Sequence, residues 1–329
     1  MDIRRPKIEG YKIGNLSPNV KFTKELKIKE NEKRGEKTFS TALEKMRSEM
    51  WFPNIDITKT HIKNEIQKID GIRVIKYSKD IEDKEKLIIF FHGGGYYGGS
   101  TDTIQNTCRY IVEQTGATVI SVDYSLAPEF PYPTSINEGY AILKHFSNRY
   151  ESIYLGGDSA GGGLACSVCI KDIEEGSKIA DGLIMYYPVL LIDLKYNCRE
   201  DFTWDIKEYD IDETSPDSGL MKSEATGLKY AMPYIKDMYI KTNEPKDNYY
   251  ISQINAPDSL LKQFPKTLIF TSEYDYLRLE AEYFHKRLKE NGIKSVGIRY
   301  AGEVHAFIDK IGFNDNVIDS VDEIKEFIK

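Results

Sequence analysis

The segment SIYLGGDSAGG, residues 152–162, joins a short apolar run to a G-x-S-x-G motif. Residues 152–155 are predicted to form a strand and residues 160–174 a helix, which leaves Ser159 on the turn between them. A sharp strand-to-helix turn lifts a serine oxygen out of the sheet, and glycines on either side let backbones approach closely. The helix amino terminus also favours negative charge that develops beside it. The motif in this setting predicts that Ser159 is a catalytic nucleophile.

Short β-rich runs alternate with helical patterns on both sides of this segment. Several runs are apolar along their whole length, as expected for parallel strands that are buried on both faces. This alternation predicts an α/β fold with a mostly parallel central sheet flanked by helices. The predicted strands are 73–78, 86–91, 118–122, 152–155, 182–187, 267–271 and 295–300, and the main helices are 102–114, 134–149, 160–174 and 279–291.

Two regions interrupt the alternation, an amino-terminal segment at 1–60 and an insertion at 193–250. We expect them to form one helical cap over the carboxyl edge of the sheet, where open α/β sheets bind ligands. The two parts of the core are then 61–192 and 251–329. The alternative is a disordered leader and an irregular loop. Five of the tyrosines of the insertion could line a pocket or pack the cap onto the sheet; these five are Tyr196, Tyr209, Tyr230, Tyr234 and Tyr239.

A glycine-rich loop, His92-Gly93-Gly94-Gly95, directly follows the predicted strand 86–91. Successive glycines allow several N–H groups to point at one oxygen, which stabilises the oxyanion of a tetrahedral intermediate in acyl transfer. We expect Gly93 and Gly94 to donate from this loop, together with the N–H of Ala160 after the nucleophile. His92 is expected to hold the loop by hydrogen bonding. Taken alone, the motif would suggest only a flexible glycine turn.

A serine needs a general base, and the base needs an acid that orients it. Of the five histidines, only His305 falls in a loop just after a late predicted strand. That position suits the chain order nucleophile, acid, histidine. Glu273 and Asp275 both follow the predicted strand 267–271 and precede His305. The residue pattern alone does not choose between these two carboxylates.

Residues 86–310 resemble the hormone-sensitive-lipase-like esterases, a branch of the α/β-hydrolases. The matching motifs are HGGGYYGGSTDT from His92, DYSLAPE from Asp123, GGDSAGG from Gly156, DYLR from Asp275 and HAF from His305. The resemblance implies an α/β-hydrolase fold with a helical cap, and a serine esterase that needs no cofactor or metal. It also implies that Asp275 is the acid. Ser125 stands where the family usually has arginine, so how the loop 125–133 is held stays open.

The leading hypothesis is a lipase-like carboxylesterase that hydrolyses short-chain carboxylic esters through an acyl-enzyme on Ser159. The same machinery could instead act as an amidase, a peptidase or a deacetylase. A catalytically silent small-molecule receptor on a hydrolase fold is the alternative from another class. Such a receptor is expected to lose a member of the triad, whereas Ser159, Asp275 and His305 are all present.

The composition limits the partners. Lys and Arg number 45 and Asp and Glu 52, and the net charge of −7 disfavours nucleic acid. No apolar run approaches the length of a membrane span, and the amino terminus carries no apolar stretch typical of a signal peptide. The four cysteines are too few for a disulfide framework, and Cys166 and Cys169 are expected to be buried on a helix. We therefore expect a cytoplasmic protein with a small-molecule ester as its partner, either alone or as a homo-oligomer.

Overall fold

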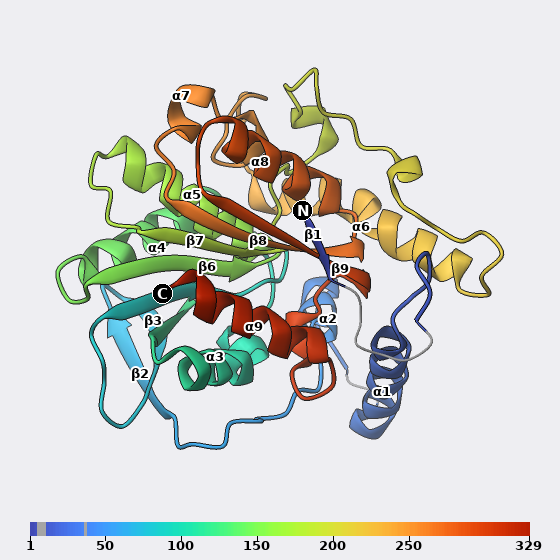
Figure 1. The fold of residues 1–329 in the computed structure, drawn as a ribbon, viewed down its shortest axis with the longest axis horizontal. Helices are drawn as coiled ribbons and strands as arrows, with labels where there is room; N and C mark the ends of the chain where they lie inside the picture. The colour runs from blue at the N-terminus through green and yellow to red at the C-terminus, as the bar shows by residue number, and fades with distance from the viewer. Residues whose placement is uncertain (5–10, 36–37) are drawn as a thin grey trace.

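A single twisted sheet of nine strands organises the computed structural model, which describes residues 1–4, 11–35 and 38–329 (Figure 1). The strand order is β1-β9-β8-β7-β6-β4-β5-β3-β2. Only the pairs β2–β3 and β3–β5 are antiparallel, so the predicted mostly parallel sheet is confirmed. The strands are β1 (Asp2–Arg4), β2 (Lys63–Ile69), β3 (Ile72–Ser78), β4 (Lys86–Phe91), β5 (Thr118–Asp123), β6 (Ser152–Asp158), β7 (Gly182–Tyr186), β8 (Lys266–Tyr274) and β9 (Ser295–Val304).

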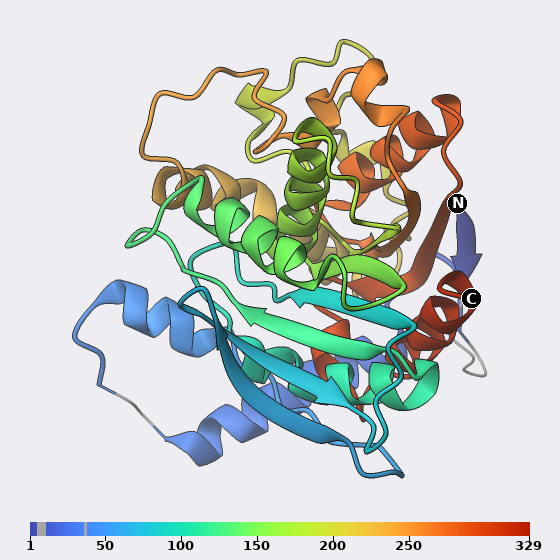
Figure 2. The ribbon, with the colours of Figure 1, turned by 90° about the vertical axis from the view of Figure 1, so that its left-hand side faces the viewer.

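Helices cover both faces of this sheet (Figures 1 and 2). Helices α3 and α9 pack on one face, and α4, α5 and α8 pack on the other. The helices are α1 (Pro18–Arg34), α2 (Ala42–Glu49), α3 (Thr101–Thr115), α4 (Thr134–Phe146), α5 (Ala160–Glu174), α6 (Ser218–Tyr239), α7 (Asp258–Leu261), α8 (Arg278–Glu290) and α9 (Asp315–Phe327), with short 3₁₀ turns η1 (Leu194–Tyr196), η2 (Ile206–Glu208), η3 (Gln253–Asn255) and η4 (Ile308–Lys310).

Strand β4 shows why the central strands are apolar throughout. Ile89 and Phe91 point into the core under α4 and α5, whereas Ile88 and Phe90 point into the core under α3 and α9. Successive side chains of a strand face opposite sides of the sheet, so a strand with helices on both faces must be apolar at every position. All four of these side chains are at most 1% exposed.

Three strands run several residues further than predicted, and some strands and helices were not predicted. Strand β6 continues to Asp158, β8 to Tyr274 and β9 to Val304, through glycines and polar residues that give little β signal. Strands β1 and β2 and helices α7 and α9 were missed. β2 is an edge strand whose first four side chains are exposed, so its sequence KNEIQKI carries no apolar face. Because the longer strands end beside the motifs, they determine where the site residues lie.

The two predicted cap segments contribute helices at one end of the sheet. Figure 1 shows α1 and α6 together at the right-hand end, with α2 close by. The cavity described below is lined by side chains of α1 and α6 as well as by loops at the carboxyl ends of β4, β6 and β9. The division of the chain into cap and core stays a proposal. None of the described helices combines the length and the apolar character that crossing a membrane requires.

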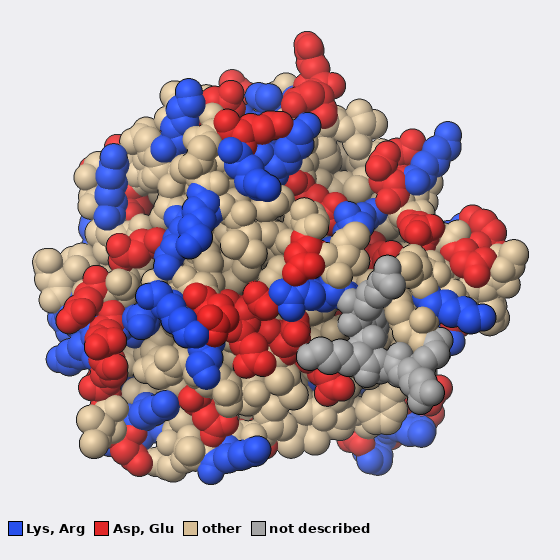
Figure 3. Space-filling model, in the orientation of Figure 1, with Lys and Arg blue, Asp and Glu red and all other residues tan. Residues whose placement is uncertain are grey.

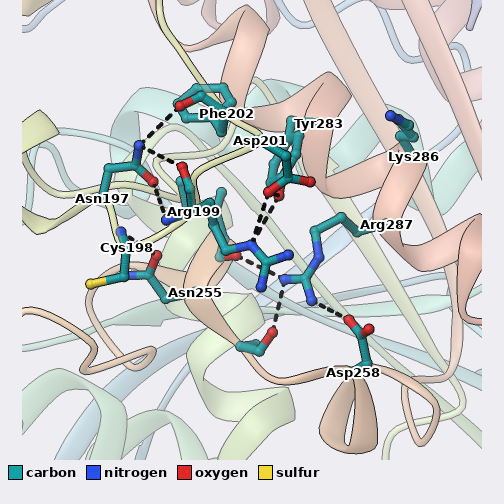
Figure 4. A network of polar contacts seen from close by, with 12 residues as sticks. Asn197, Cys198, Arg199, Asp201, Phe202, Asn255, Asp258, Tyr283, Lys286 and Arg287 are labelled. Atoms are coloured by element: carbon teal, nitrogen blue, oxygen red, sulfur yellow. Dashed lines mark hydrogen bonds and ion pairs between the residues drawn. The ribbon is translucent and has the colours of Figure 1, made fainter.

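The insertion is fastened to the core by a polar network (Figure 4). Arg199 Nε donates to the hydroxyl of Tyr283 on α8 at 3.0 Å, and that hydroxyl donates to Asp201 at 2.7 Å. Arg287, also on α8, donates to the carbonyl oxygens of Ile254 and Ala256, each at 2.8 Å. Charge-assisted hydrogen bonds of this kind, made by the half-buried Arg199 and the buried Arg287, hold a segment in one position. Helix α8 thereby contacts both the beginning of the insertion and the chain that directly follows it.

A buried histidine on α8 predicts an acid-sensitive contribution to stability. His285 is 5% exposed and lies 2.8 Å from the hydroxyl of Ser295. Burial, followed by the positive charges of the amino terminus and Lys289, lowers the pKa of His285 from 6.5 to about 4. The unfolded chain therefore takes up a proton before the folded chain does as the pH falls through this range. Stability is lost between about pH 6.5 and pH 4.

Replacing His285 by glutamine should remove part of this acid sensitivity. We expect the loss of unfolding free energy between pH 7 and pH 4.5 to be smaller in His285→Gln by at most about 3 kcal/mol. Urea unfolding at both pH values measures it, with the exposed His61→Gln as the control. An equal loss of stability in the wild type and in His285→Gln would contradict this account.

Candidate active site

Ser159 lies on a strained turn between β6 and α5. Its backbone has φ 54° and ψ −120°, a conformation that side-chain-bearing residues rarely adopt. The Ser159 N–H donates to the carbonyl oxygen of Tyr186 at 2.9 Å, which ties the turn to β7. A Cβ at position 161 would lie 2.1 Å from the carbonyl oxygen of Phe91, so only glycine fits there. The G-x-S-x-G pattern thus encodes the close packing that presents the Ser159 hydroxyl.

Ser159, His305 and Asp275 form a continuous chain of polar contacts. The Ser159 hydroxyl oxygen lies 3.0 Å from His305 Nε2, and His305 Nδ1 lies 2.6 Å from Asp275 Oδ2. Asp275 is fully buried, and its other oxygen accepts the Leu277 N–H at 3.0 Å. The hydroxyl of Tyr209 donates to the Asp275 carbonyl oxygen at 2.8 Å. The structure therefore brings the three residues named from the sequence together, on loops that follow β6, β8 and β9.

The second carboxylate considered from the sequence points elsewhere. Glu273 does not lie past a strand end, as expected, because β8 continues to Tyr274. Its Oε2 accepts the N–H of Gly302 at 2.6 Å, within the paired strands β8 and β9. No hydrogen bond joins it to His305 among the described residues. Glu273 is therefore positioned to hold the strand that precedes His305.

His92 lies beneath the glycine loop. Its Nδ1 lies 2.8 Å from the carbonyl oxygen of Gly93, and its ring stacks on that of Tyr124, with 4.4 Å between ring centroids. The Tyr124 hydroxyl donates to the His92 carbonyl oxygen at 2.8 Å. Burial lowers the pKa of His92. These contacts hold the loop in shape, which is the role expected for His92.

One of the two expected oxyanion donors is already occupied. The Gly93 N–H donates to Asp158 Oδ1 at 2.8 Å, so the expectation that it faces a reacting oxygen is wrong for this conformation. The N–H groups of Gly94, Gly95 and Ala160 have no hydrogen-bond partner in the described parts of the chain. Burial raises the pKa of the Asp158 carboxyl well above its usual range. Asp158 therefore acts as the anchor of the glycine loop, a role that the sequence did not indicate.

A cavity of about 360 Å³ opens over Ser159 and His305. Its apolar wall comes from Met50, Trp51 and Phe52, which lie between α2 and β2, and from one face of α6. Charged side chains of α1 and of the segment after His305 complete the lining. Pockets for small molecules commonly combine apolar walls with a few placed polar groups. Both predicted cap segments therefore contribute to this cavity.

The tyrosines of the insertion do not line the cavity. Tyr209 and Tyr239 are buried in packing contacts, whereas Tyr230 and Tyr234 are 79% and 51% exposed. Tyr196 is half-buried and packs against the hydrophobic core. The aromatic side chains that do line the cavity belong to Trp51, Phe52 and Tyr97. The hypothesis that the insertion supplies a tyrosine wall is wrong.

Arg47 of α2 holds the loop 125–133, where this chain has Ser125 in place of the arginine that is usual in the family. Its guanidinium donates to the carbonyl oxygens of Tyr97 at 2.6 Å and Ala127 at 3.0 Å, and it pairs with the carboxylate of Glu129. The Ser125 hydroxyl meanwhile donates to Glu138 at 2.6 Å. Arg47 thus links the amino-terminal segment to the glycine loop and to the loop 125–133.

The cysteines give no sign of a metal site. Cys166 and Cys169 are buried on α5, as expected, and burial raises the pKa of both thiols. Within residues 1–4, 11–35 and 38–329, no three His, Cys, Asp or Glu side chains are grouped so that they could hold a metal ion.

Comparison with known proteins places the chain in a family. Residues 88–309 match the model of a protein family whose description is "alpha/beta hydrolase fold". An esterase of Gibberella moniliformis is 28% identical over 280 residues, which cover 78% of this chain and 81% of that protein. A hormone-sensitive lipase of Ictidomys tridecemlineatus is 30% identical over 139 residues, 39% of this chain and 18% of its own length. The crystal structure of a thermostable carboxylesterase cloned from a metagenomic library superimposes with a TM-score of 0.68 at 26% identity, covering 95% of this chain and 97% of that one.

The fold and these matches define a carboxylic ester hydrolase of the α/β-hydrolase class. Within that class, the chain belongs to the hormone-sensitive-lipase-like esterase family.

Proposed function

We propose that this protein hydrolyses short-chain carboxylic esters through an acyl-enzyme on Ser159. The observation that carries the proposal is the contact chain from Ser159 through His305 to Asp275 at the base of the cavity. Nucleophile, base and orienting acid are the three parts that acyl transfer by serine requires.

The reaction proceeds in two halves. Ser159 attacks the ester carbonyl carbon while His305 Nε2 takes its proton; the tetrahedral intermediate then collapses, and His305 returns the proton to the leaving alcohol. In the second half, His305 takes a proton from water, the resulting hydroxide attacks the acyl-enzyme, and Ser159 leaves with that proton. The carboxylate of Asp275 accepts a hydrogen bond from His305 Nδ1–H throughout the reaction. This hydrogen bond fixes the imidazole tautomer and stabilises the imidazolium.

The oxyanion is held by the backbone. We assign Gly94, Gly95 and Ala160 as donors, because their N–H groups have no other partner in the described chain and both glycines line the cavity. The Gly93–Asp158 hydrogen bond fixes the loop from which two of the three donate. Donors placed in advance need no reorganisation as charge develops, which is a large part of the catalytic effect in such sites.

The size and lining of the cavity favour short acyl chains. About 360 Å³ holds a small ester, and charged side chains interrupt the apolar wall. We expect kcat/KM over a series of p-nitrophenyl esters to peak between acetyl and hexanoyl and to fall at least about tenfold by decanoyl, because each further buried CH₂ must find apolar surface. The series from acetyl to palmitoyl, measured below the micelle concentration, tests this. A maximum at long chains with activation by lipid droplets would overturn the assignment.

The partner proposed is thus a small ester and not a nucleic acid. Basic and acidic side chains are interspersed over the face shown in Figure 3, and the net charge is −7. We also propose a reducing compartment such as the cytoplasm, because all four cysteines are free thiols and three of them are buried.

A further inference from the structure

Two lysines line the same cavity as Ser159 and His305 and have no carboxylate of a described residue within ion-pair distance. They are Lys27 of α1 and Lys310 at the end of η4. The Lys27 ammonium donates to one backbone oxygen, the carbonyl of Glu49, at 3.1 Å. The Lys310 ammonium donates no hydrogen bond to any described residue. An ammonium group has three donors, so most of the hydrogen-bonding capacity of this pair is unused.

Lys310 is a buried cation that faces the cavity. Only 7% of the residue is exposed, and its ammonium lies 5.7 Å from the ring centre of Phe52. Burial lowers the pKa of Lys310, and burial together with the nearby charge of Lys310 lowers the pKa of Lys27. A desolvated, unpaired ammonium is costly, and two that repel each other are more so. An anion between them would offset both costs.

Most neighbouring acids are already engaged. Glu224 on α6 pairs with Lys24 at 2.5 Å. The buried Glu303 accepts hydrogen bonds from the amides of Asn314 at 2.7 Å and Asn316 at 2.9 Å. These contacts leave Glu224 and Glu303 near Lys310 but occupied by other partners.

Among the described residues that line the cavity, Asp309 is the remaining carboxylate, and its side chain makes no hydrogen bond or ion pair with a described residue. It lies near the buried Asp158, and burial raises the pKa of Asp309 to about 6. Asp158 is occupied by the Gly93 N–H. Two ammonium groups with unused N–H donors and the free carboxylate of Asp309 therefore line one cavity, and these donors are available to an anionic ligand.

We propose that Lys27 and Lys310 form an anion-binding subsite, and that the preferred substrate is a short ester that carries a free carboxylate. This inference rests on the proposed esterase function and names its substrate class. The carboxylate could belong to the acyl part or to the alcohol part of the ester. In both cases the two ammonium groups bind it while the carbonyl lies at Ser159, within one small cavity.

Two pairs of esters of matched shape test the proposal and distinguish the two orientations. Monomethyl glutarate against methyl hexanoate places the carboxylate in the acyl part. 3-Acetoxypropanoate against butyl acetate places it in the alcohol part. We expect the wild type to prefer the anionic member of one pair by about tenfold or more in kcat/KM, the scale of a charge-assisted hydrogen bond. Preference for the neutral member in both pairs would overturn the inference.

Variants locate the effect. Lys310→Met should abolish the preference while retaining turnover of the neutral ester, Lys27→Met should reduce it, and Lys310→Arg should retain part of it. Lys21→Met is the matched control, because Lys21 lies on α1, the helix that carries Lys27. Lys21 is half-exposed and pairs with Asp217 outside the cavity. An unchanged preference in folded Lys310→Met would contradict the subsite.

Failure of the subsite and failure of the esterase function give different results. Hydrolysis of both members without preference leaves the esterase function and removes the subsite. Calorimetric binding of monomethyl glutarate to Ser159→Ala, lost in Ser159→Ala/Lys310→Met, supports the subsite even if the wild type turns over neither ester. Absence of that binding, when the wild type turns over neither ester, also removes the subsite.

Discussion

Ser159→Ala should lower kcat/KM for p-nitrophenyl acetate by about 10⁴-fold or more, because the only covalent nucleophile of the proposed mechanism is lost. Alanine keeps the Cβ and can occupy the same backbone conformation, in which φ is 54°. The fold should therefore remain intact. Initial rates at a single pH, with circular dichroism and thermal unfolding of the same samples, measure both parts of the prediction.

The control for this substitution is Ser147→Ala, at the exposed end of α4. It should have the turnover and melting temperature of the wild type. A folded Ser159→Ala protein that retains turnover would remove Ser159 from the mechanism, whatever the control shows.

Asp275→Asn should reduce kcat by up to about 10⁴-fold, whereas Glu273→Gln should reduce it only a few-fold. Asparagine at 275 can donate to His305 Nδ1 and so favours the tautomer in which Nε2 carries the proton and cannot accept one from Ser159. Glu273 instead accepts the Gly302 N–H, and glutamine can still accept that hydrogen bond through its amide oxygen. The measurement is the pH profile of kcat for both variants.

The pH profile separates a catalytic from a structural effect. Loss through the wrong tautomer should be partly recovered at high pH, while loss through misfolding should not. If Glu273→Gln proves the more damaging variant in kcat with an intact fold, the assignment of the acid is reversed.

The fold and the positions of Ser159 and His305 could be predicted from the sequence, because short stretches of sequence determine them. Central strands such as β4 are apolar at every position, since helices cover both faces, and this pattern is unlike that of a surface helix. Ser159 and His305 each directly follow a strand of a parallel sheet, at its carboxyl end, where ligand sites gather. The choice of Asp275 over Glu273 needed the family resemblance, because both carboxylates were predicted to lie on one loop.

The incorrect or missing predictions concern residues whose role depends on contacts between parts of the chain that are far apart in the sequence. Nothing in the glycine motif indicates that Asp158, 65 positions away, occupies the Gly93 N–H. Arg47 is one of many basic residues in the polar amino-terminal segment, and its role depends on the placement of α2 against the loop 125–133. Whether Tyr230, Tyr234 and Tyr239 pack inside or face solvent depends on how α6 lies on the core. The periodicity of the sequence does not determine that placement.

Covalent labelling with a fluorophosphonate probe, followed by intact-mass measurement and peptide mapping, tests the central claim most directly. The account predicts a single adduct on Ser159 in the native wild-type protein. It also predicts strongly reduced labelling in Asp275→Asn, because the serine then lacks a base in the correct tautomer. No adduct on the native wild-type protein, or an adduct on a residue other than Ser159, would contradict it.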